Sequence, residues 1–193
     1  MQKIGETFYP DTEHLKHVER WNQLREFLPV AYEWVEKWGS CIDGGAFAGL
    51  WSRSYAHRFD RVYAFEPVPE NVECVRLNTP PNVTIIPCAL SQHPGFKRFR
   101  LKGGNFAHLG DGEEWVWGTN IDSFEYSNLG LIKLDVEGQE VATLEGAVKT
   151  IALHRPVICV EIKYEGEEIR TWLRANAYSR KAGNGLDEVW SPE

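Results

Sequence analysis

A short apolar stretch that ends in an acid and runs into glycines constrains the fold of this chain most. Residues 40–49 read Ser-Cys-Ile-Asp-Gly-Gly-Ala-Phe-Ala-Gly, so Asp43 closes the apolar part and glycines follow it. This order is typical of a buried parallel strand that ends in a tight turn before a helix. Gly45 and Gly49 can take positive φ, and glycine lets a ligand approach the backbone closely. The stretch therefore predicts a nucleotide-like ligand held above one edge of a sheet.

The spacing of the glycines argues against a dinucleotide. The nearest G-x-G-x-x-G frame has Ala46 where the middle glycine that admits a pyrophosphate is required. Residues 61–66 read Arg-Val-Tyr-Ala-Phe-Glu, a second strand that ends in a carboxylate after one intervening helix. A carboxylate at the end of the neighbouring strand is where a ribose diol is held. We therefore predict Glu66 as the ribose ligand.

Helix and strand patterns alternate along the rest of the chain. After a loosely ordered arm over residues 1–11 we expect helices over 12–28, 30–38, 50–59, 69–78, 138–151 and 165–176. We expect further strands over 82–90, 130–135 and 156–162, and a closing antiparallel pair over 178–181 and 187–190. This alternation predicts an α/β fold, doubly wound, with a mostly parallel seven-stranded Rossmann-like sheet, N-terminal helices and a C-terminal antiparallel hairpin.

Residues 92–118 interrupt the alternation, and we interpret them as an inserted substrate lip. Two segments, 95–101 and 113–119, have the alternation of exposed antiparallel strands, and the glycine-rich segment 102–112 between them is predicted as a long loop. Asn105 and His108 are its polar groups best suited to touch an acceptor, although His108 fits a solvated loop histidine equally. The chain is then one domain, 1–193, in which 1–39 form a helical cover.

Composition excludes several function classes. The 193 residues carry a net charge of −7, which argues against a nucleic-acid partner because phosphate binding requires clustered basic residues. The four cysteines form no C-x-x-C pair and are expected to be free thiols in a reducing compartment. No apolar run approaches the roughly 18 residues of a membrane helix. We expect a cytoplasmic monomer or homodimer with no nucleic-acid or membrane partner.

Four blocks of the sequence together resemble the FkbM-type methyltransferases, which are similar to other class I methyltransferases that use S-adenosylmethionine. The blocks are 43–49 (Asp-Gly-Gly-Ala-Phe-Ala-Gly), 62–67 (Val-Tyr-Ala-Phe-Glu-Pro), 131–138 (Leu-Ile-Lys-Leu-Asp-Val-Glu-Gly) and 157–161. The first block departs from the family, which more often has Gly-Ala-Asn there. The resemblance implies S-adenosyl-L-methionine as cofactor and a hydroxyl of a sugar or secondary metabolite as methyl acceptor.

The predicted cofactor site combines the glycine turn, the strand-end acids and an adenine pocket. Its residues are Asp43, Gly44, Gly45, Ala46, Gly49, Glu66, Pro67, Ala89, Leu90 and Asp135. Ala89 and Leu90 are implied by the resemblance, and an ordinary strand end explains them equally well.

Acids at strand ends also supply the predicted catalytic groups. Asp43, Glu66, Asp135 and Glu161 all end predicted parallel strands and should share one edge of the sheet. Asp135 and Glu137 are the candidates for binding the acceptor and removing its proton, with His108 of the lip as a third.

The general base is not assigned to a single residue. Neighbouring carboxylates raise the pKa of one acid, and Lys133, which the strand period puts on the face of Asp135, opposes that shift. A metal held by Asp135, Glu137 and Glu161 is the competing chemical interpretation. No histidine or cysteine joins these acids at ligand spacing, so we predict no metal.

Two other function classes stay open. A chain with this fold can serve as a non-catalytic binding or assembly module that retains the cofactor site. A nicotinamide enzyme is the other, disfavoured by the missing middle glycine.

Overall fold

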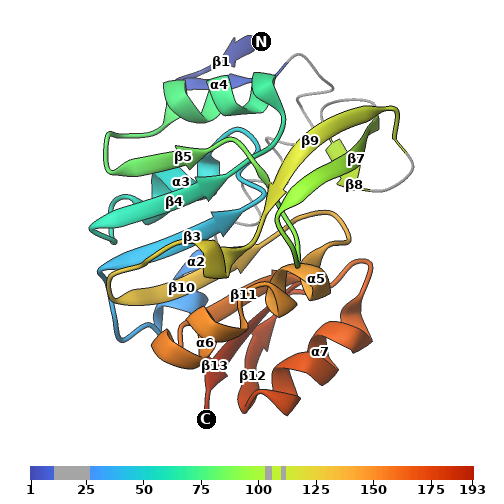
Figure 1. Ribbon diagram of the computed structural model, residues 1–193. Coiled ribbons are helices and arrows are strands. Elements are labelled where there is room, and N and C mark those ends of the chain that lie inside the picture. Colours follow the sequence, from blue (N-terminus) through green and yellow to red (C-terminus); the bar gives the residue numbers. More distant parts are fainter. Residues whose placement is uncertain (11–26, 103–105, 110–111) are drawn as a thin grey trace.

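A seven-stranded sheet forms the centre of the computed structural model, which describes residues 1–10, 27–102, 106–109 and 112–193 (Figure 1). Its strands lie in the order β12-β13-β11-β10-β3-β4-β5. They are β3 (Ser40–Gly44), β4 (Arg61–Phe65), β5 (Val83–Ile86), β10 (Leu129–Leu134), β11 (Val157–Glu161), β12 (Tyr178–Gly183) and β13 (Asp187–Pro192). The five neighbouring strands β11, β10, β3, β4 and β5 pair in parallel, and β13 pairs antiparallel with both β11 and β12. The predicted fold class is confirmed.

Helices cover both faces of this sheet. On one face lie α2 (Leu28–Tyr32), α3 (Leu50–Tyr55) and α4 (Pro69–Asn78). On the other lie the 3-10 helix η1 (Ile121–Ser123), α5 (Glu140–Glu145), α6 (Val148–His154) and α7 (Gly166–Ala175). Strand residues alternate between the two layers, so Cys41 and Leu131 pack in the first core and Ile42 and Ile132 in the second. Burial on both faces explains why the central strands are mostly apolar, with Asp43 and Lys133 as buried charged exceptions.

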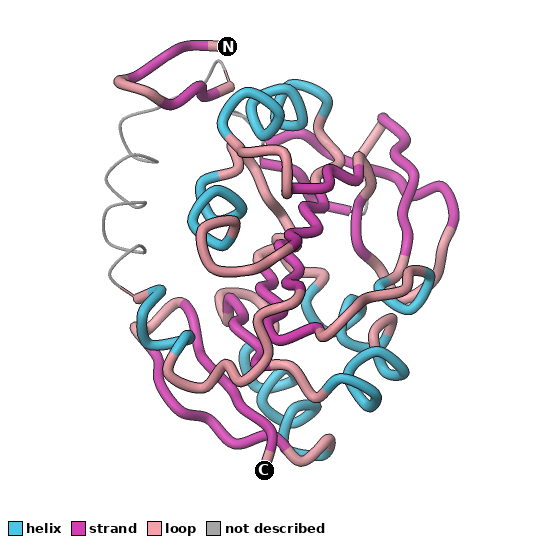
Figure 2. Tube along the Cα trace, turned by 90° about the vertical axis from the view of Figure 1, so that its left-hand side faces the viewer, coloured by secondary structure: helices cyan, strands magenta, loops and turns pink. Residues whose placement is uncertain are grey.

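The N-terminal segment differs from its prediction. Residues expected as a loosely ordered arm form a hairpin of β1 (Gln2–Ile4) and β2 (Thr7–Tyr9), visible beside the N-terminus in Figure 2. Asn78, at the end of α4, accepts a hydrogen bond from the backbone N–H of Phe8 at 2.8 Å and donates to its carbonyl at 2.6 Å. The hairpin is therefore fixed by a residue about 70 positions away, which no local pattern reveals.

The two predicted N-terminal helices are described only in part. Most of the first, 12–28, lies outside the described residues. The second is shorter than predicted. It begins earlier, at Leu28, because Pro29 fits in the first turn of a helix.

A packed glycine also divides one predicted helix. The helix expected over 138–151 is split into α5 and α6, because the backbone leaves the helical conformation at Gly146 and Ala147. Gly146 lies so close to Ser91 that a Cβ there would stand 2.5 Å from its carbonyl oxygen. The carboxylate of Asp122 then accepts hydrogen bonds from the backbone N–H groups of Lys149 and Thr150, at 3.0 and 2.8 Å. These two hydrogen bonds cap the start of α6.

The inserted segment and the short strand before it form a second, four-stranded sheet with the order β6-β9-β7-β8. Its strands are β6 (Ala89–Leu90), β7 (Gly95–Lys102), β8 (Phe106–Leu109) and β9 (Glu114–Thr119). The strand predicted over 82–90 is thus divided between the two sheets, and the predicted loop over 102–112 contains β8, which pairs antiparallel with β7. Asn105 lies outside the described residues. Figure 1 shows this sheet at the right, beside one edge of the central sheet.

Within the described part of the chain, no helix combines the length and the apolar character that crossing a bilayer requires.

Candidate functional site

The four strand-end acids lie at the same edge of the central sheet, as predicted. Asp43 is near the end of β3, Glu66 directly follows β4, Asp135 directly follows β10, and Glu161 is the last residue of β11. These four strands are adjacent and parallel, so their carboxyl ends meet. Asp43, Glu66 and Glu161 are almost fully buried, whereas 22% of the side chain of Asp135 is exposed. Asp135 therefore faces solvent more than the other three acids.

The glycine turn after β3 is tied to strands on both sides. The backbone N–H groups of Gly45 and Ala46 both donate to the carbonyl oxygen of Phe65, each at 3.0 Å. Gly45 has a φ of 77°, and a Cβ at this position would stand 1.8 Å from the carbonyl oxygen of Asp135. Only glycine fits here, because both the positive φ and the contact with Asp135 exclude a side chain. The turn thus fixes β3 against the loop that presents Asp135.

A buried lysine contacts this turn and the acids beside it. Lys133 in β10 is 2% exposed, and its Nζ lies 3.4 Å from Asp43 Oδ1 and 3.7 Å from Asp135 Oδ2. The same ammonium group donates to the carbonyl oxygens of Gly44 and Gly45, at 3.4 and 3.2 Å. Burial would lower the pKa of Lys133, but the carboxylates of Asp43 and Asp135 outweigh it and raise the pKa above its usual value. The lysine is therefore a charged link between the two acids and the turn.

The contacts that the structure shows for the carboxylate of Asp43 are with other residues of the protein. Its Oδ2 accepts a hydrogen bond from the hydroxyl of Ser52 at 2.6 Å, and its Oδ1 faces Lys133. Its side chain is fully buried. These contacts suit a residue that shapes the turn; direct contact of Asp43 with a cofactor stays a prediction.

Glu66 is held at the opposite side of the turn by three N–H donors. Its carboxylate accepts hydrogen bonds from the backbone N–H groups of Phe47 at 2.8 Å and Val68 at 2.9 Å, and from the side-chain amide of Asn71 at 3.2 Å. Phe47 has a φ of 51°, an uncommon conformation for an aromatic residue that the bond to Glu66 helps to hold. Burial raises the pKa of Glu66 to about 7, although these hydrogen bonds act in the opposite direction. The carboxylate is thus fixed in place, and its pKa lies near neutral pH.

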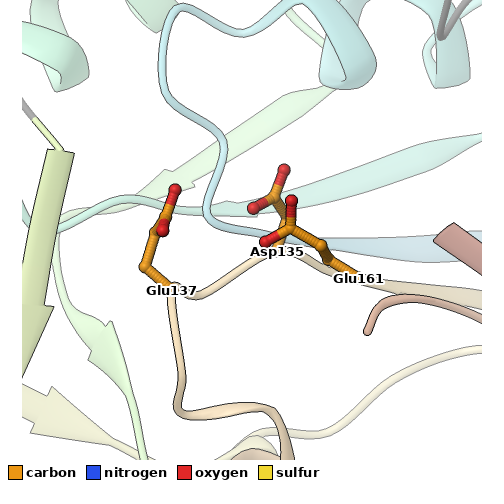
Figure 3. Close-up of side chains that lie close together, drawn as sticks. All are labelled: Asp135, Glu137 and Glu161. Carbon is orange, nitrogen blue, oxygen red and sulfur yellow. The ribbon is translucent and has the colours of Figure 1, made fainter. Parts of the chain in front are cut away.

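Three carboxylates gather beside the turn, as Figure 3 shows. Oxygen atoms of Asp135, Glu137 and Glu161 lie within 4.8 Å of one another. Lysines compensate part of this charge, since Lys133 pairs with Asp135 and the Nζ of Lys163 lies 3.4 Å from Glu137 Oε2. The acids can therefore coexist without an added cation. The absence of a metal stays a prediction, as does the alternative metal site at the same three residues.

Glu140 is a residue of this site that sequence reasoning missed. Its carboxylate accepts hydrogen bonds from the backbone N–H groups of Val136 at 2.9 Å and Gly138 at 3.0 Å. Those bonds hold a loop in which Glu137 and Gly138 have φ values of 53° and 87°. Glu140 is 1% exposed, and burial raises its pKa to about 7. The sequence signal for it is an acid two residues after the Glu-Gly step.

The remaining predicted residues lie around this centre. Ala89 and Leu90 of β6 are buried, and the side chain of Leu90 packs so closely on the turn that a Cβ at Gly44 would be 2.9 Å from it. Gly49, with a φ of 78°, ends the turn immediately before α3, and Pro67 follows Glu66. His108 belongs to β8, at the register position opposite Arg100. The roles of these residues stay predictions.

A family comparison bears on this edge of the sheet. Residues 116–180 match the family model described as the methyltransferase FkbM domain. This part of the chain, about a third of its length, is similar to the FkbM-type methyltransferase domain. The match includes Lys133, Asp135, Glu137 and Glu161, and it confirms the resemblance that the sequence blocks indicate. Among curated proteins none matches the chain.

Solved structures share the fold at low sequence identity. Methyltransferase FkbM from Methylobacillus flagellatus KT has a TM-score of 0.59 and 17% identity over 79% of this chain, which spans 42% of that protein. Precorrin 8w decarboxylase from Methanobacterium thermoautotrophicum has a TM-score of 0.56 and 13% identity, with full coverage of both chains. Magnesium protoporphyrin IX methyltransferase from Synechocystis, with bound SAM, has a TM-score of 0.52 and 13% identity over 92% of this chain and 80% of that one.

The solved structures show a shared Rossmann-like fold, and the similarity to the FkbM methyltransferase domain covers residues 116–180. They do not specify the acceptor.

Proposed function

We propose that this protein is an S-adenosylmethionine-dependent methyltransferase that methylates a hydroxyl oxygen, on a sugar or a secondary metabolite. The observation that carries the proposal is the row of acids at the ends of four adjacent parallel strands, beside a glycine turn that two of those strands hold in place. The match of residues 116–180 to the FkbM domain supports it.

The cofactor side of the site fits a nucleoside ligand. Glu66 accepts N–H donors through both of its carboxylate oxygens, and each oxygen can accept more than one hydrogen bond. In the proposal Glu66 binds the ribose hydroxyls, Gly44 to Gly49 lie along the amino-acid part of the ligand, and Ala89 and Leu90 contact the adenine. When bound, S-adenosylmethionine supplies a methyl group whose bond to sulfur breaks as the acceptor oxygen takes it.

Asp135 and Glu137 are the proposed acceptor-binding and proton-accepting residues. Both are partly exposed, with 22% and 14% of their side chains accessible, so an acceptor can reach them. Glu161, in contrast, is buried. Holding a hydroxyl in line with the methyl group contributes about 7 to 11 kcal/mol to such reactions. A carboxylate that takes the hydroxyl proton contributes a further factor of about 10² to 10⁴ in rate. Residues 92–118, with His108, form the acceptor side of this arrangement.

The experiment measures S-adenosylhomocysteine release with a panel of hydroxyl compounds, including monosaccharides and phenols. Asp135→Asn and Glu137→Gln remove a proton acceptor at nearly constant shape, and the exposed Glu168 of α7 supplies the control Glu168→Gln. We expect one or both site variants to lower the rate by about 10² or more while the control matches the wild type. Cofactor affinity is measured in parallel by calorimetry.

Two results would decide against the proposal in different ways. Cofactor binding without methyl transfer to any acceptor would favour the non-catalytic binding module. Absence of cofactor binding would remove the methyltransferase interpretation altogether. The cytoplasmic location stays a proposal too, in keeping with the four free cysteines.

A further inference from the structure

An exposed aromatic surface lies on the four-stranded sheet, on strands β7 and β9 of the predicted lip, and none of its residues is among the predicted site residues. Phe96, Trp115 and Trp117 are 70%, 61% and 46% exposed. The register of β7 and β9 places Phe96 opposite Trp117 and Arg98 opposite Trp115. We call the set Phe96, Arg98, Arg100, Trp115 and Trp117 the aromatic-arginine face. Exposed apolar side chains that lie side by side mark interaction sites when their patch is large.

The opposite side of the same two strands is packed. Phe99 is 4% exposed, and Gly118 is buried with the side chain of Lys97 so close that a Cβ would be 2.8 Å from it. Because side chains alternate along a strand, the residues on the packed side of the sheet make the contacts with the rest of the protein. The aromatic rings on the other side therefore contribute little to the core, and their exposure calls for another explanation.

The geometry of the rings disfavours a stacking ligand. The ring planes of Phe96 and Trp117 meet at 87°, with centroids 5.2 Å apart. The guanidinium of Arg98 lies 5.5 Å from the ring centre of Trp115 and covers one of its faces. Single-stranded nucleic acid is bound on open ring faces that follow one another along a groove. These rings are turned edge to face or covered, so they do not form such a ladder.

The charge on this face disfavours a symmetric contact with a second copy. A two-fold contact would bring Arg98 and Arg100 of both copies to the same interface, where like charges repel. On this face β7 places Arg98 and Arg100, and the strand contains no acid, in a chain with a net charge of −7. The complementary partner is therefore anionic and also able to receive aromatic rings.

We propose that the aromatic-arginine face docks on the surface of an anionic lipid bilayer. Aromatic rings favour the headgroup region, where their apolar bodies are buried and their edges stay hydrated, and arginines are drawn to anionic headgroups. The sequence predicts no membrane partner because it lacks an apolar segment long enough to span a bilayer. That argument does not apply to a surface formed by alternate residues of two strands, which binds at the headgroups without spanning the bilayer. This inference goes beyond methyl transfer and does not depend on it.

The test is co-sedimentation with vesicles of phosphatidylcholine alone and of phosphatidylcholine with about 30% phosphatidylglycerol, at low and moderate salt. We expect the wild type to pellet with the anionic vesicles, less with neutral ones, and less as salt rises. The double variants Phe96→Ser with Trp115→Ser, and Arg98→Gln with Arg100→Gln, should each weaken binding by about tenfold or more. Leu153→Ser removes a side chain of α6 that is 76% exposed, and this control should bind like the wild type.

Retained cofactor affinity and unchanged far-ultraviolet circular dichroism would show that the variants are folded, separating this test from that of the proposed function. Wild-type protein that stays in the supernatant with anionic vesicles would overturn the proposal. So would equal losses in Leu153→Ser and the double variants. Binding of a single-stranded oligonucleotide, or self-association, that both double variants abolish while vesicle binding is absent would identify a different partner.

Discussion

The substitution Lys133→Met tests the charged link beneath the glycine turn. Lys133 is the cation beside Asp43, whose carboxylate is fully buried and otherwise bonded to the hydroxyl of Ser52. Methionine fills similar space without charge, so it leaves a carboxylate buried without its counterion. Breaking a buried ion pair from one side costs about 3 to 5 kcal/mol. For a chain of this size that corresponds to a fall in Tm of roughly 6 to 20 °C.

The assay is urea unfolding followed by circular dichroism, with two further variants. Lys163→Met removes a lysine that is 44% exposed and pairs with Glu137, and we expect a loss of about 1 kcal/mol or less. The double variant Lys133→Met with Asp43→Asn removes both buried charges, so it should be more stable than Lys133→Met alone. A free energy of unfolding for Lys133→Met within about 1 kcal/mol of wild type would refute the reasoning. A double variant no more stable than Lys133→Met alone would refute the coupling.

Three further predictions follow from the same site. Burial raises the pKa values of Glu66 and Glu140 from 4.5 to about 7, so the folded state binds their protons more tightly than the unfolded state does. The free energy of unfolding should therefore fall as the pH rises from about 4.5 to about 7. In pH-dependent denaturation, a double variant Glu66→Gln with Glu140→Gln that keeps the wild-type slope would contradict this. Gly45→Ala should abolish cofactor binding in calorimetry, because its Cβ would stand 1.8 Å from the carbonyl oxygen of Asp135, and retained affinity would show that the turn adapts. Glu140→Leu should lower methyl transfer at least tenfold by releasing the loop that carries Glu137, by about 1 kcal/mol for each lost hydrogen bond; an unchanged rate would separate that loop from the chemistry.

The sequence predicts well those parts of the site that short-range patterns encode. An apolar run, an acid and glycines occur within ten residues at β3, and β4 and β10 also end at acids, so the common edge of Asp43, Glu66 and Asp135 follows from parallel pairing. The pairing of Lys133 with Asp135 was predictable from the strand period, whereas the closer contact of Lys133 with Asp43 depends on the pairing of β10 with β3.

The features that were missed depend on contacts made after folding. Glu140 is a helix residue in sequence terms, and its role appears only when the loop before it takes positive φ values and turns two N–H groups towards its carboxylate. The N-terminal hairpin depends on Asn78, far along the chain. The strand β8 lies in a glycine-rich segment whose pairing with β7 outweighs its composition.

The central claim is that Glu66 binds the ribose of S-adenosylmethionine at the edge shared by the strand-end acids. The most direct measurement is the calorimetric dissociation constant of S-adenosylhomocysteine at a pH of about 8, where Glu66 is ionised, for wild type and Glu66→Gln. The exposed Glu36 provides the control Glu36→Gln. Because hydrogen bonds to a charged group contribute about 1.5 to 3 kcal/mol, we predict binding by wild type and control and an affinity weaker by about tenfold or more in Glu66→Gln. Equal affinities in all three proteins would contradict the claim.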